Sequence, residues 1–131
     1  MIVREVMSAP VFAIEPTERL LDAFNLMIRH QIKHLPVVEN DQLVGLISDR
    51  DLLGHAVREN GAYVFPRQSV ETIMIKDVIT CRPEDKLEDT LGLMLKEDIS
   101  CLPVVENGLI VGIVTSRSFL KQMHCQETGK R

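Results

Sequence analysis

The sequence is poor in the residues on which several classes of site depend. It has no tryptophan and a single tyrosine, so it offers few aromatic platforms on which nucleic-acid bases could stack. Its formal net charge of −4 also argues against a broad nucleic-acid surface. Its apolar runs are far shorter than the roughly 20 residues that cross a bilayer. We therefore expect neither a nucleic-acid-binding surface nor a membrane span.

The cysteines and histidines form no pattern typical of a metal site or a disulfide framework. Cys81, Cys101 and Cys125 are odd in number and lack C-x-x-C spacing, which favours a reducing compartment. The histidines lack metal-binding spacings, and no nucleophile–base triad or P-loop occurs. The N-terminal residues lack the apolar core of a signal peptide. We therefore expect a cytoplasmic protein with no catalysis and no resident metal.

The sequence contains an internal duplication. Residues 3–53 align with residues 70–120 at a constant offset of 67 without a gap, and 19 of the 51 aligned positions are identical. The clearest block is Leu-Pro-Val-Val-Glu-Asn, which occurs at residues 35–40 and again at 102–107. A solenoid needs at least three repeats, and its repeats are shorter than this offset. We interpret them as a tandem pair of units.

Each copy has the pattern of a β-α-β-β-α unit. A short apolar segment (11–14 or 78–81) is followed by a proline and then by an amphipathic helix. Two strands with turn residues between them come next, and a second helix follows. The strands are expected at residues 34–38, 43–47, 101–105 and 109–114. The first helices should bury Leu20, Phe24, Met27 and Ile28 in one copy, and Leu87, Leu91, Met94 and Leu95 in the other.

The expected fold is therefore of the α/β (α+β) class, with two tandem units. We expect the first unit over residues 1–60, a linker over 61–69, the second unit over 70–124 and a flexible tail over 125–131. The residues that join the copies, 54–69, have the composition of a helix end followed by a loop.

The start of the second helix in the first copy is the main candidate site. An apolar strand stops at Ser48, where a helix begins, and a helix start offers unpaired amides to an anion. Ser48 adds a hydroxyl and Asp51 a carboxylate at the same place. The same spacing is almost that of a capping box, which needs no ligand. The sequence leaves both interpretations open, and they are compatible.

The motifs of the duplicated unit resemble those of a cystathionine-β-synthase-type (CBS) domain pair. The resemblance rests on Leu35-Pro36-Val37-Val38, on Gly45-x-x-Ser48-x-x-Asp51, and on the gapless second copy. It implies two units packed as an intramolecular pair through their sheets, with two clefts between them. It also implies a regulatory role through an adenosine-containing ligand (AMP, ADP, ATP or S-adenosylmethionine) and a homodimer.

The resemblance also implies roles for particular residues. Asp51 would accept hydrogen bonds from both ribose hydroxyls, and Ser48 would lie beside ribose or phosphate. The purine slot would come from the other copy, and basic residues would gather at the phosphates. The slot falls here on Ile79, Ile99, Ser100 and Cys101, and the basic candidates are Lys33, His34, Arg50 and Arg117. Lys33 and His34 could instead be a solvated strand end, and Cys101 a core residue.

The second copy departs from the family pattern, because Ser118 occupies the position of the aspartate. A hydroxyl makes one weaker bond to a diol where a carboxylate accepts two charge-assisted bonds. We therefore expect the Asp51 cleft to bind and the Ser118 cleft to be weak or empty. The leading hypothesis is a non-catalytic sensor of an adenine nucleotide that acts on an unidentified protein target. The alternative is a dimerisation scaffold with unoccupied clefts.

Overall fold

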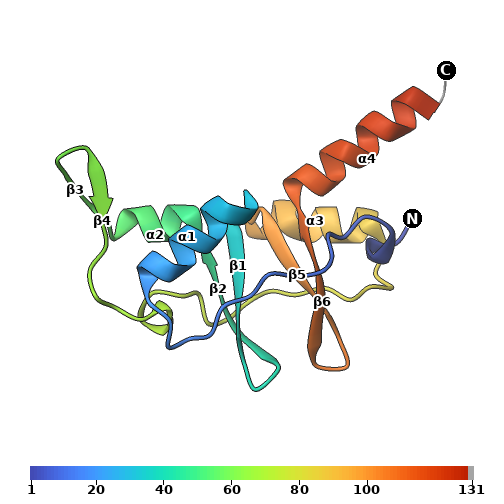
Figure 1. Ribbon diagram of the computed structural model, residues 1–131. Helices are drawn as coiled ribbons and strands as arrows, with labels where there is room; N and C mark the ends of the chain where they lie inside the picture. The colour runs from blue at the N-terminus through green and yellow to red at the C-terminus, as the bar shows by residue number, and fades with distance from the viewer. Residues whose placement is uncertain (130–131) are drawn as a thin grey trace. The chain divides into compact units, whose positions relative to one another are not determined.

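The computed structural model describes residues 1–129 and divides the chain into two compact units (Figure 1). The repeat-1 unit consists of residues 12–78. The repeat-2 unit consists of residues 1–11 together with 79–131. No helix within residues 1–129 is both long enough and apolar enough to cross a membrane.

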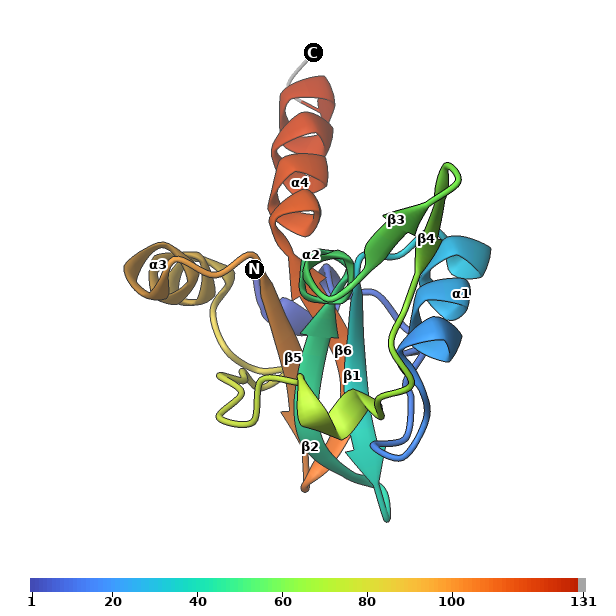
Figure 2. The ribbon, with the colours of Figure 1, turned by 90° about the vertical axis from the view of Figure 1, so that its left-hand side faces the viewer.

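The repeat-1 unit combines one hairpin sheet with two helices and a smaller hairpin (Figures 1 and 2). Strands β1 and β2 are antiparallel, and α1 and α2 contact each other. Its elements are α1 (Leu20–His30), β1 (His34–Glu39), β2 (Gln42–Ser48), α2 (Asp49–Gly54), β3 (Val57–Glu59), β4 (Ala62–Val64) and the 3-10 turn η2 (Val70–Thr72).

The repeat-2 unit has the same plan without the smaller hairpin (Figure 2). Its elements are η1 (Val3–Glu5), α3 (Leu87–Glu97), β5 (Cys101–Glu106), β6 (Leu109–Thr115) and α4 (Ser116–Gly129). The mixed α/β (α+β) class with two tandem units predicted from the sequence is therefore confirmed, although the first strand of each predicted β-α-β-β-α unit is only a single bridge. The predicted tail, residues 125–131, falls partly within α4, and residues 130–131 lie outside the described residues.

The two main hairpins are built in the same way. Asn40-Asp41 and Asn107-Gly108 all adopt positive φ angles, between 53° and 81°, which a tight hairpin turn requires. Both hairpins carry an irregularity at the same position, between Val37 and Val38 and between Val104 and Val105. The expected first strands are reduced to single bridges, in which Ile14 pairs with Val37 and Cys81 with Val104.

The helix stripe expected from the sequence is partly wrong. Leu20 and Met27 are buried as predicted, and Met94 is buried in the second copy. Ile28 and Leu95, however, are 60% and 74% exposed. The buried residues of α1 are Leu20, Ala23 and Met27. This stripe is narrower than expected, so Ile28 faces away from the core.

Each copy's leading segment packs into the core of the other copy. Val3 is fully buried in the repeat-2 cluster, and Val70 is fully buried in the repeat-1 cluster. Methionines from these segments lie over the two strand glycines: a Cβ on Gly45 would clash with Met74, and one on Gly112 would clash with Met7. These close contacts explain why a glycine is needed at the same position in both copies.

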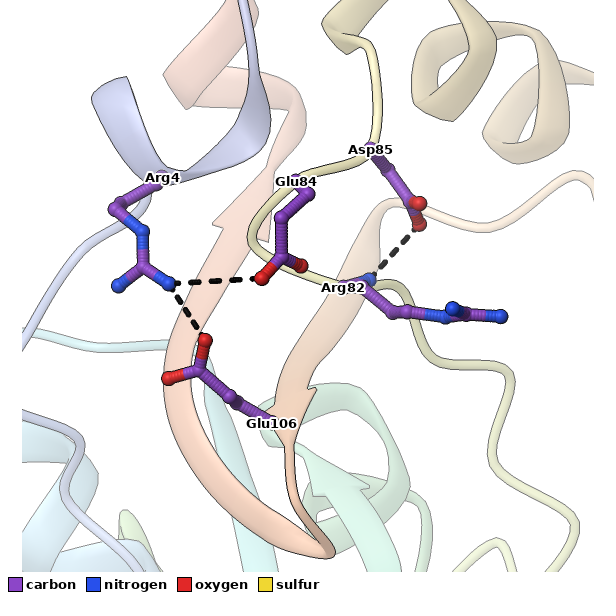
Figure 3. A network of polar contacts seen from close by, with 5 residues as sticks. All are labelled: Arg4, Arg82, Glu84, Asp85 and Glu106. Carbon is purple, nitrogen blue, oxygen red and sulfur yellow. Dashed lines mark hydrogen bonds and ion pairs between the residues drawn. The ribbon is translucent and has the colours of Figure 1, made fainter.

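An ion-pair cluster holds the first of these leading segments (Figure 3). The Arg4 guanidinium lies 2.6 Å from a Glu106 carboxylate oxygen and 3.9 Å from one of Glu84. The backbone N–H of Arg82 donates to Asp85 at 2.9 Å in the adjoining turn. All of these residues belong to the repeat-2 unit, so the cluster ties residues 1–11 to that unit.

The residues between the copies do not form the expected helix end and loop. After α2 ends at Gly54, β3 and β4 pair around Asn60-Gly61, which again has positive φ angles. Phe65 and Tyr63 then pack against Phe24 of α1. The predicted domain division stays a prediction; its bounds are 1–60, 61–69, 70–124 and 125–131. It was drawn from the repeats in the sequence, whereas the two compact units are defined by contacts in the structure.

Candidate functional site

The start of α2 is a complete capping box. Ser48 is the N-cap residue, and its Oγ accepts the backbone N–H of Asp51 at 3.1 Å. In return, the Asp51 carboxylate oxygen Oδ2 accepts the backbone N–H of Ser48, also at 3.1 Å. The capping interpretation is therefore confirmed. The half-buried Asp51 carboxylate has a second oxygen, Oδ1, which accepts no hydrogen bond from residues 1–129.

The first amides of α2 are not free. The N–H of Asp49 donates to the Lys33 carbonyl at 2.9 Å, and the N–H of Arg50 donates to the Asp49 carboxylate at 2.8 Å. The N–H of Asp51 is held by Ser48. The expectation that open amides would receive an anion is therefore wrong for this structure. What the helix start presents instead is an acceptor, the second oxygen of Asp51.

His34 lies across the hairpin from this helix start. It pairs in register with Ser48 and is half-buried. Burial lowers the pKa of His34 below its ordinary value of 6.5, and Lys33 acts in the same direction. The carboxylates of Asp49 and Asp51 act in the opposite direction but do not outweigh burial. His34 is therefore mostly neutral at pH 7 in the free protein, and its expected role as a cation stays a prediction.

Asp49 was not among the residues expected at the site, yet its charge reaches His34 as that of Asp51 does. Its position in the first helical turn was the available signal, because an acid there is favoured by the helix dipole. Lys33 and Arg50 are exposed. Both therefore carry positive charge close to the start of α2.

The equivalent helix start in the repeat-2 unit makes the same contact to the cap residue's N–H with a different side chain. The N–H of Thr115 donates to Ser118 Oγ at 3.1 Å, in the place where Ser48 donates to Asp51. The N–H of Ser116 donates to the Ser100 carbonyl at 3.1 Å, as Asp49 does to Lys33. Ser118 is only 8% exposed. The serine therefore preserves the backbone contact but offers no second oxygen.

The other expected residues of the repeat-2 unit differ in exposure. Ile79 and Ile99 are half-buried and pack against the buried cluster, whereas Ser100 and Arg117 are exposed. Cys101 is 5% exposed, so its thiol belongs to the core. Burial raises the pKa of Cys101 to about 12 and that of Cys81 to about 11. Both thiols therefore stay protonated and unreactive at neutral pH.

The ten expected site residues thus form two groups on separate units. Within each unit the structure brings together the strand residue, the cap and the residue three positions later. Lys33, His34, Ser48, Arg50 and Asp51 belong to the repeat-1 unit, and Ile79, Ile99, Ser100, Cys101 and Arg117 to the repeat-2 unit. Within the described part of the chain, no three His, Cys, Asp or Glu side chains gather as metal ligands.

Comparison with known proteins gives a consistent result. The family model of the CBS domain matches residues 3–58 and again residues 70–124. A CBS domain-containing protein of Bacillus subtilis is 31% identical over 112 residues, which cover 86% of this chain and 78% of that protein. A homoserine O-acetyltransferase of Methanobrevibacter ruminantium is 37% identical over 117 residues, 88% of this chain but 22% of the enzyme.

The solved structures agree with this match. A CBS domain pair in complex with 5′-methylthioadenosine and S-adenosyl-L-methionine has a TM-score of 0.84 and 28% identity to this chain. The similarity covers 96% of this chain and 98% of that one. Among the curated sequences, the chain spans between 22% and 46% of the length of the first three relatives it matches.

Proposed function

The chain belongs to the CBS domain family, and we propose that it is a regulatory module that binds an adenosine-containing ligand. It does so without catalysis. The similar CBS domain pair that carries 5′-methylthioadenosine and S-adenosyl-L-methionine supports this class of ligand. Enzymes occur among the relatives, and there the matched region is a minor part of the protein. The module reports occupancy through a different affinity of the ligand for two arrangements of the chain.

The observation that carries the proposal is the second carboxylate oxygen of Asp51. In the repeat-2 unit a serine hydroxyl makes the same backbone bond at the same length, 3.1 Å. Capping therefore does not require a carboxylate, and Oδ1 of Asp51 exceeds what the helix needs. A charged acceptor suits a pair of ribose hydroxyls, because charge-assisted hydrogen bonds are about twice as strong as neutral ones.

We assign the remaining expected residues around this acceptor. Ser48 lies beside the ribose, and the purine is held by Ile79, Ile99 and Ser100 together with the backbone of Cys101. Lys33, Arg50 and Arg117 supply positive charge to a phosphate-bearing ligand, and exposed Lys33 and Arg50 are free to reorient. His34 is neutral in the free protein, so it contributes as a hydrogen-bond donor unless a bound phosphate raises its pKa.

Thermal unfolding with a panel of compounds tests the proposal. AMP, ADP, ATP, S-adenosylmethionine and 5′-methylthioadenosine are compared with GTP, which shares the ribose and phosphates but not the adenine. A ligand at one hundred times its dissociation constant should add about 2.7 kcal/mol to the unfolding free energy. The response to different adenosine compounds identifies which group the site prefers beyond the nucleoside.

A matched pair of variants locates the site. Asp51→Asn should abolish the ligand-induced stabilisation while it keeps an oxygen for the Ser48 N–H. Asp22→Asn is the control, because Asp22 accepts the N–H of the α1 cap residue Arg19 at 3.3 Å in the same reciprocal position. Loss of the response in both variants, or in neither, contradicts a specific role for Asp51.

A scaffold without a ligand is the second candidate function. It is favoured by the capping box itself, which is complete in the absence of any ligand. It predicts no stabilisation by any compound at millimolar concentration. Both functions are compatible with a homodimer in the cytoplasm, for which light scattering should give about twice the chain mass of 14.8 kDa.

A further inference from the structure

Two of the six methionines are packed against the strand glycines of the duplication. Met7 lies against Gly112 and Met74 against Gly45, so closely that a Cβ at either glycine would overlap the methionine sulfur. Both methionines are partly exposed, and each packs against the buried apolar cluster of its unit. They occupy equivalent positions at the offset of 67, as the two glycines do. Each copy therefore contains the same thioether–glycine contact.

These contacts lie where each leading segment joins a hairpin. The residue after each methionine pairs with the residue after the glycine. Ile75 and Leu46 exchange backbone hydrogen bonds of 2.9 and 3.0 Å, and Ser8 and Ile113 exchange bonds of 2.8 and 3.1 Å. The backbone of each methionine is therefore fixed beside its glycine while these bonds are intact.

A sulfoxide does not fit the place of either thioether. Oxidation turns the flexible apolar side chain of methionine into a polar one with an added oxygen. The glycine backbone closes one side of each sulfur, and the apolar clusters that contain Val3 and Val70 lie against the side chains. An oxygen held against apolar groups without a hydrogen-bond donor is destabilising. The oxidised side chain is therefore more stable in water than in its contact.

The methionines fall into three pairs by exposure. An exposed pair, a buried pair and a partly exposed pair are formed by Met1 and Met123, by Met27 and Met94, and by Met7 and Met74. The exposed pair is 56% and 63% exposed, so its oxidation breaks no buried contact. The buried pair is only 3% exposed and is protected while the chain is folded. A small oxidant can therefore reach the partly exposed pair in the folded chain.

The two buried thiols do not compete for the oxidant. Cys81 and Cys101 are each 5% exposed. Burial raises the pKa of Cys81 to about 11 and that of Cys101 to about 12. Peroxides react with the thiolate, and both of these thiols stay protonated at neutral pH.

We propose that Met7 and Met74 are a pair of reversible oxidation sites, at which hydrogen peroxide releases the leading segments from the two hairpins. The sulfur lone pair attacks one peroxide oxygen, so that an S–O bond forms while the O–O bond breaks. The proton of the attacked oxygen passes to the departing hydroxide, which leaves as water. The sulfur is oxidised by two electrons and the peroxide is reduced. Methionine sulfoxide reductases reverse the step, and no adenosine ligand is required.

Timed oxidation of the full chain with hydrogen peroxide tests the proposal. All proteins carry Cys125→Ser, which removes the third thiol of the chain. Peptide mass spectrometry gives the sulfoxide fraction at each methionine, and thermal unfolding of the same samples gives the midpoint. Met1 and Met123 should react first without changing the midpoint. Met7 and Met74 should react next, in the folded chain, and lower the midpoint by about 4 °C or more. A methionine sulfoxide reductase should restore it.

Matched double variants assign the effect to these two residues. Met7→Leu combined with Met74→Leu replaces both thioethers by side chains of similar volume, and peroxide should then no longer lower the midpoint. Met27→Leu combined with Met94→Leu is the control, because this pair has the same offset but is buried. It should leave the fall unchanged. If circular dichroism shows the first double variant to be unfolded, each single variant should remove part of the fall.

Hydrogen exchange distinguishes release of the segments from a general loss of stability. The amides of Ser8 and Ile75 bond to the hairpin strands and should exchange at least about tenfold faster after oxidation. The amides of Val38 and Val105 bond elsewhere in the same hairpins, at 2.9 and 2.8 Å, and should keep their rates. A uniform increase at all four amides would contradict a local release.

Other outcomes also overturn the proposal. If Met7 and Met74 stay reduced until Met27 and Met94 react, the sites are not reached in the folded chain. If both are oxidised and the midpoint does not change, their contacts accommodate the sulfoxide. If the fall persists in the Met7→Leu and Met74→Leu double variant, it arises at another residue. The response to adenosine compounds is measured on reduced protein, so its absence would not affect these results.

Discussion

The two helix starts of the duplication solve the same structural problem with different chemistry. At α2, Asp51 closes a capping box with Ser48, and at α4, Ser118 makes the corresponding bond to Thr115. Both bonds are 3.1 Å long. The geometry of the backbone is therefore preserved while the charge is not. A duplicated fold can keep the scaffold of a site in both copies and its binding chemistry in only one.

The same contrast extends to the strand that faces each helix start. His34 of the first copy corresponds to Cys101 of the second, and Lys33 corresponds to Ser100. The first copy therefore carries titratable and charged groups where the second carries a buried thiol and a hydroxyl. If a ligand binds in one place, the repeat-1 helix start is the one equipped to recognise its polar groups.

The largest effect is expected when the second copy is given the carboxylate that it lacks. Ser118→Asp should keep the bond to the Thr115 N–H and add a free oxygen, so a second equivalent of the adenosine compound should bind. A charged hydrogen bond contributes about 1.5–3 kcal/mol, which is roughly tenfold to a hundredfold in affinity. Isothermal titration calorimetry measures the stoichiometry.

The control for this prediction places a carboxylate two residues earlier. Ser116→Asp adds the same charge at the start of α4 without the geometry of the capping position, and it should leave the stoichiometry unchanged. A single equivalent in Ser118→Asp would mean that the difference between the copies lies in other residues, such as the pair Lys33 and His34.

The caps themselves give the next largest effect. Ser48→Ala removes the acceptor of the Asp51 N–H and should lower the unfolding free energy by about 1 kcal/mol. Thr115→Val should cost less, because no hydrogen bond to the Thr115 hydroxyl is found among residues 1–129. Urea unfolding of the two variants measures both values, and equal losses would show that the two caps are energetically alike.

The hairpins and caps of this fold could be predicted from the sequence because their signals are local. The dipeptide Asn107-Gly108 predicts a hairpin turn, and the spacing of Ser48 and Asp51 predicts the capping box. The small hairpin β3–β4 was missed although Asn60-Gly61 carries the same signal. Its strands have only three residues each and are exposed, so they are too short to show the apolar alternation by which a strand is recognised.

The exchange of leading segments could not be predicted, and the duplication itself is the reason. Val3 and Val70 are identical residues at equivalent positions, so the pattern of apolar residues fits either core equally well. The neutral state of His34 was equally inaccessible, because it depends on how deeply tertiary packing buries the ring. Local sequence was thus enough to predict the backbone of the helix start, whereas the charge state of His34 depends on long-range packing.

The leading segments give a smaller, structural test of the contrast between the copies. Arg4 pairs with Glu106 and Glu84, whereas its counterpart Glu71 forms no ion pair within residues 1–129. Because Arg4 and Glu84 are about half or more exposed, Arg4→Gln should cost only about 0.2–1 kcal/mol. Glu71→Gln should cost less. Raising the salt concentration should remove the difference between wild type and Arg4→Gln, and a difference that persists would indicate packing by the arginine stem.

His34 gives the smallest effect at neutral pH and the clearest one in acid. Because its folded pKa lies below the ordinary 6.5, the unfolded chain binds more protons as the pH falls through that value. The unfolding free energy should therefore decrease from pH 7 toward pH 5, and His34→Gln should make this decrease shallower while leaving stability above pH 7 nearly unaffected. Its counterpart Cys101, with a pKa of about 12, titrates in neither state over this range and contributes only in alkali, where the unfolded thiol ionises first. Urea unfolding of both proteins at several pH values measures the slopes, and identical slopes would show that the histidine is not buried as the structure places it.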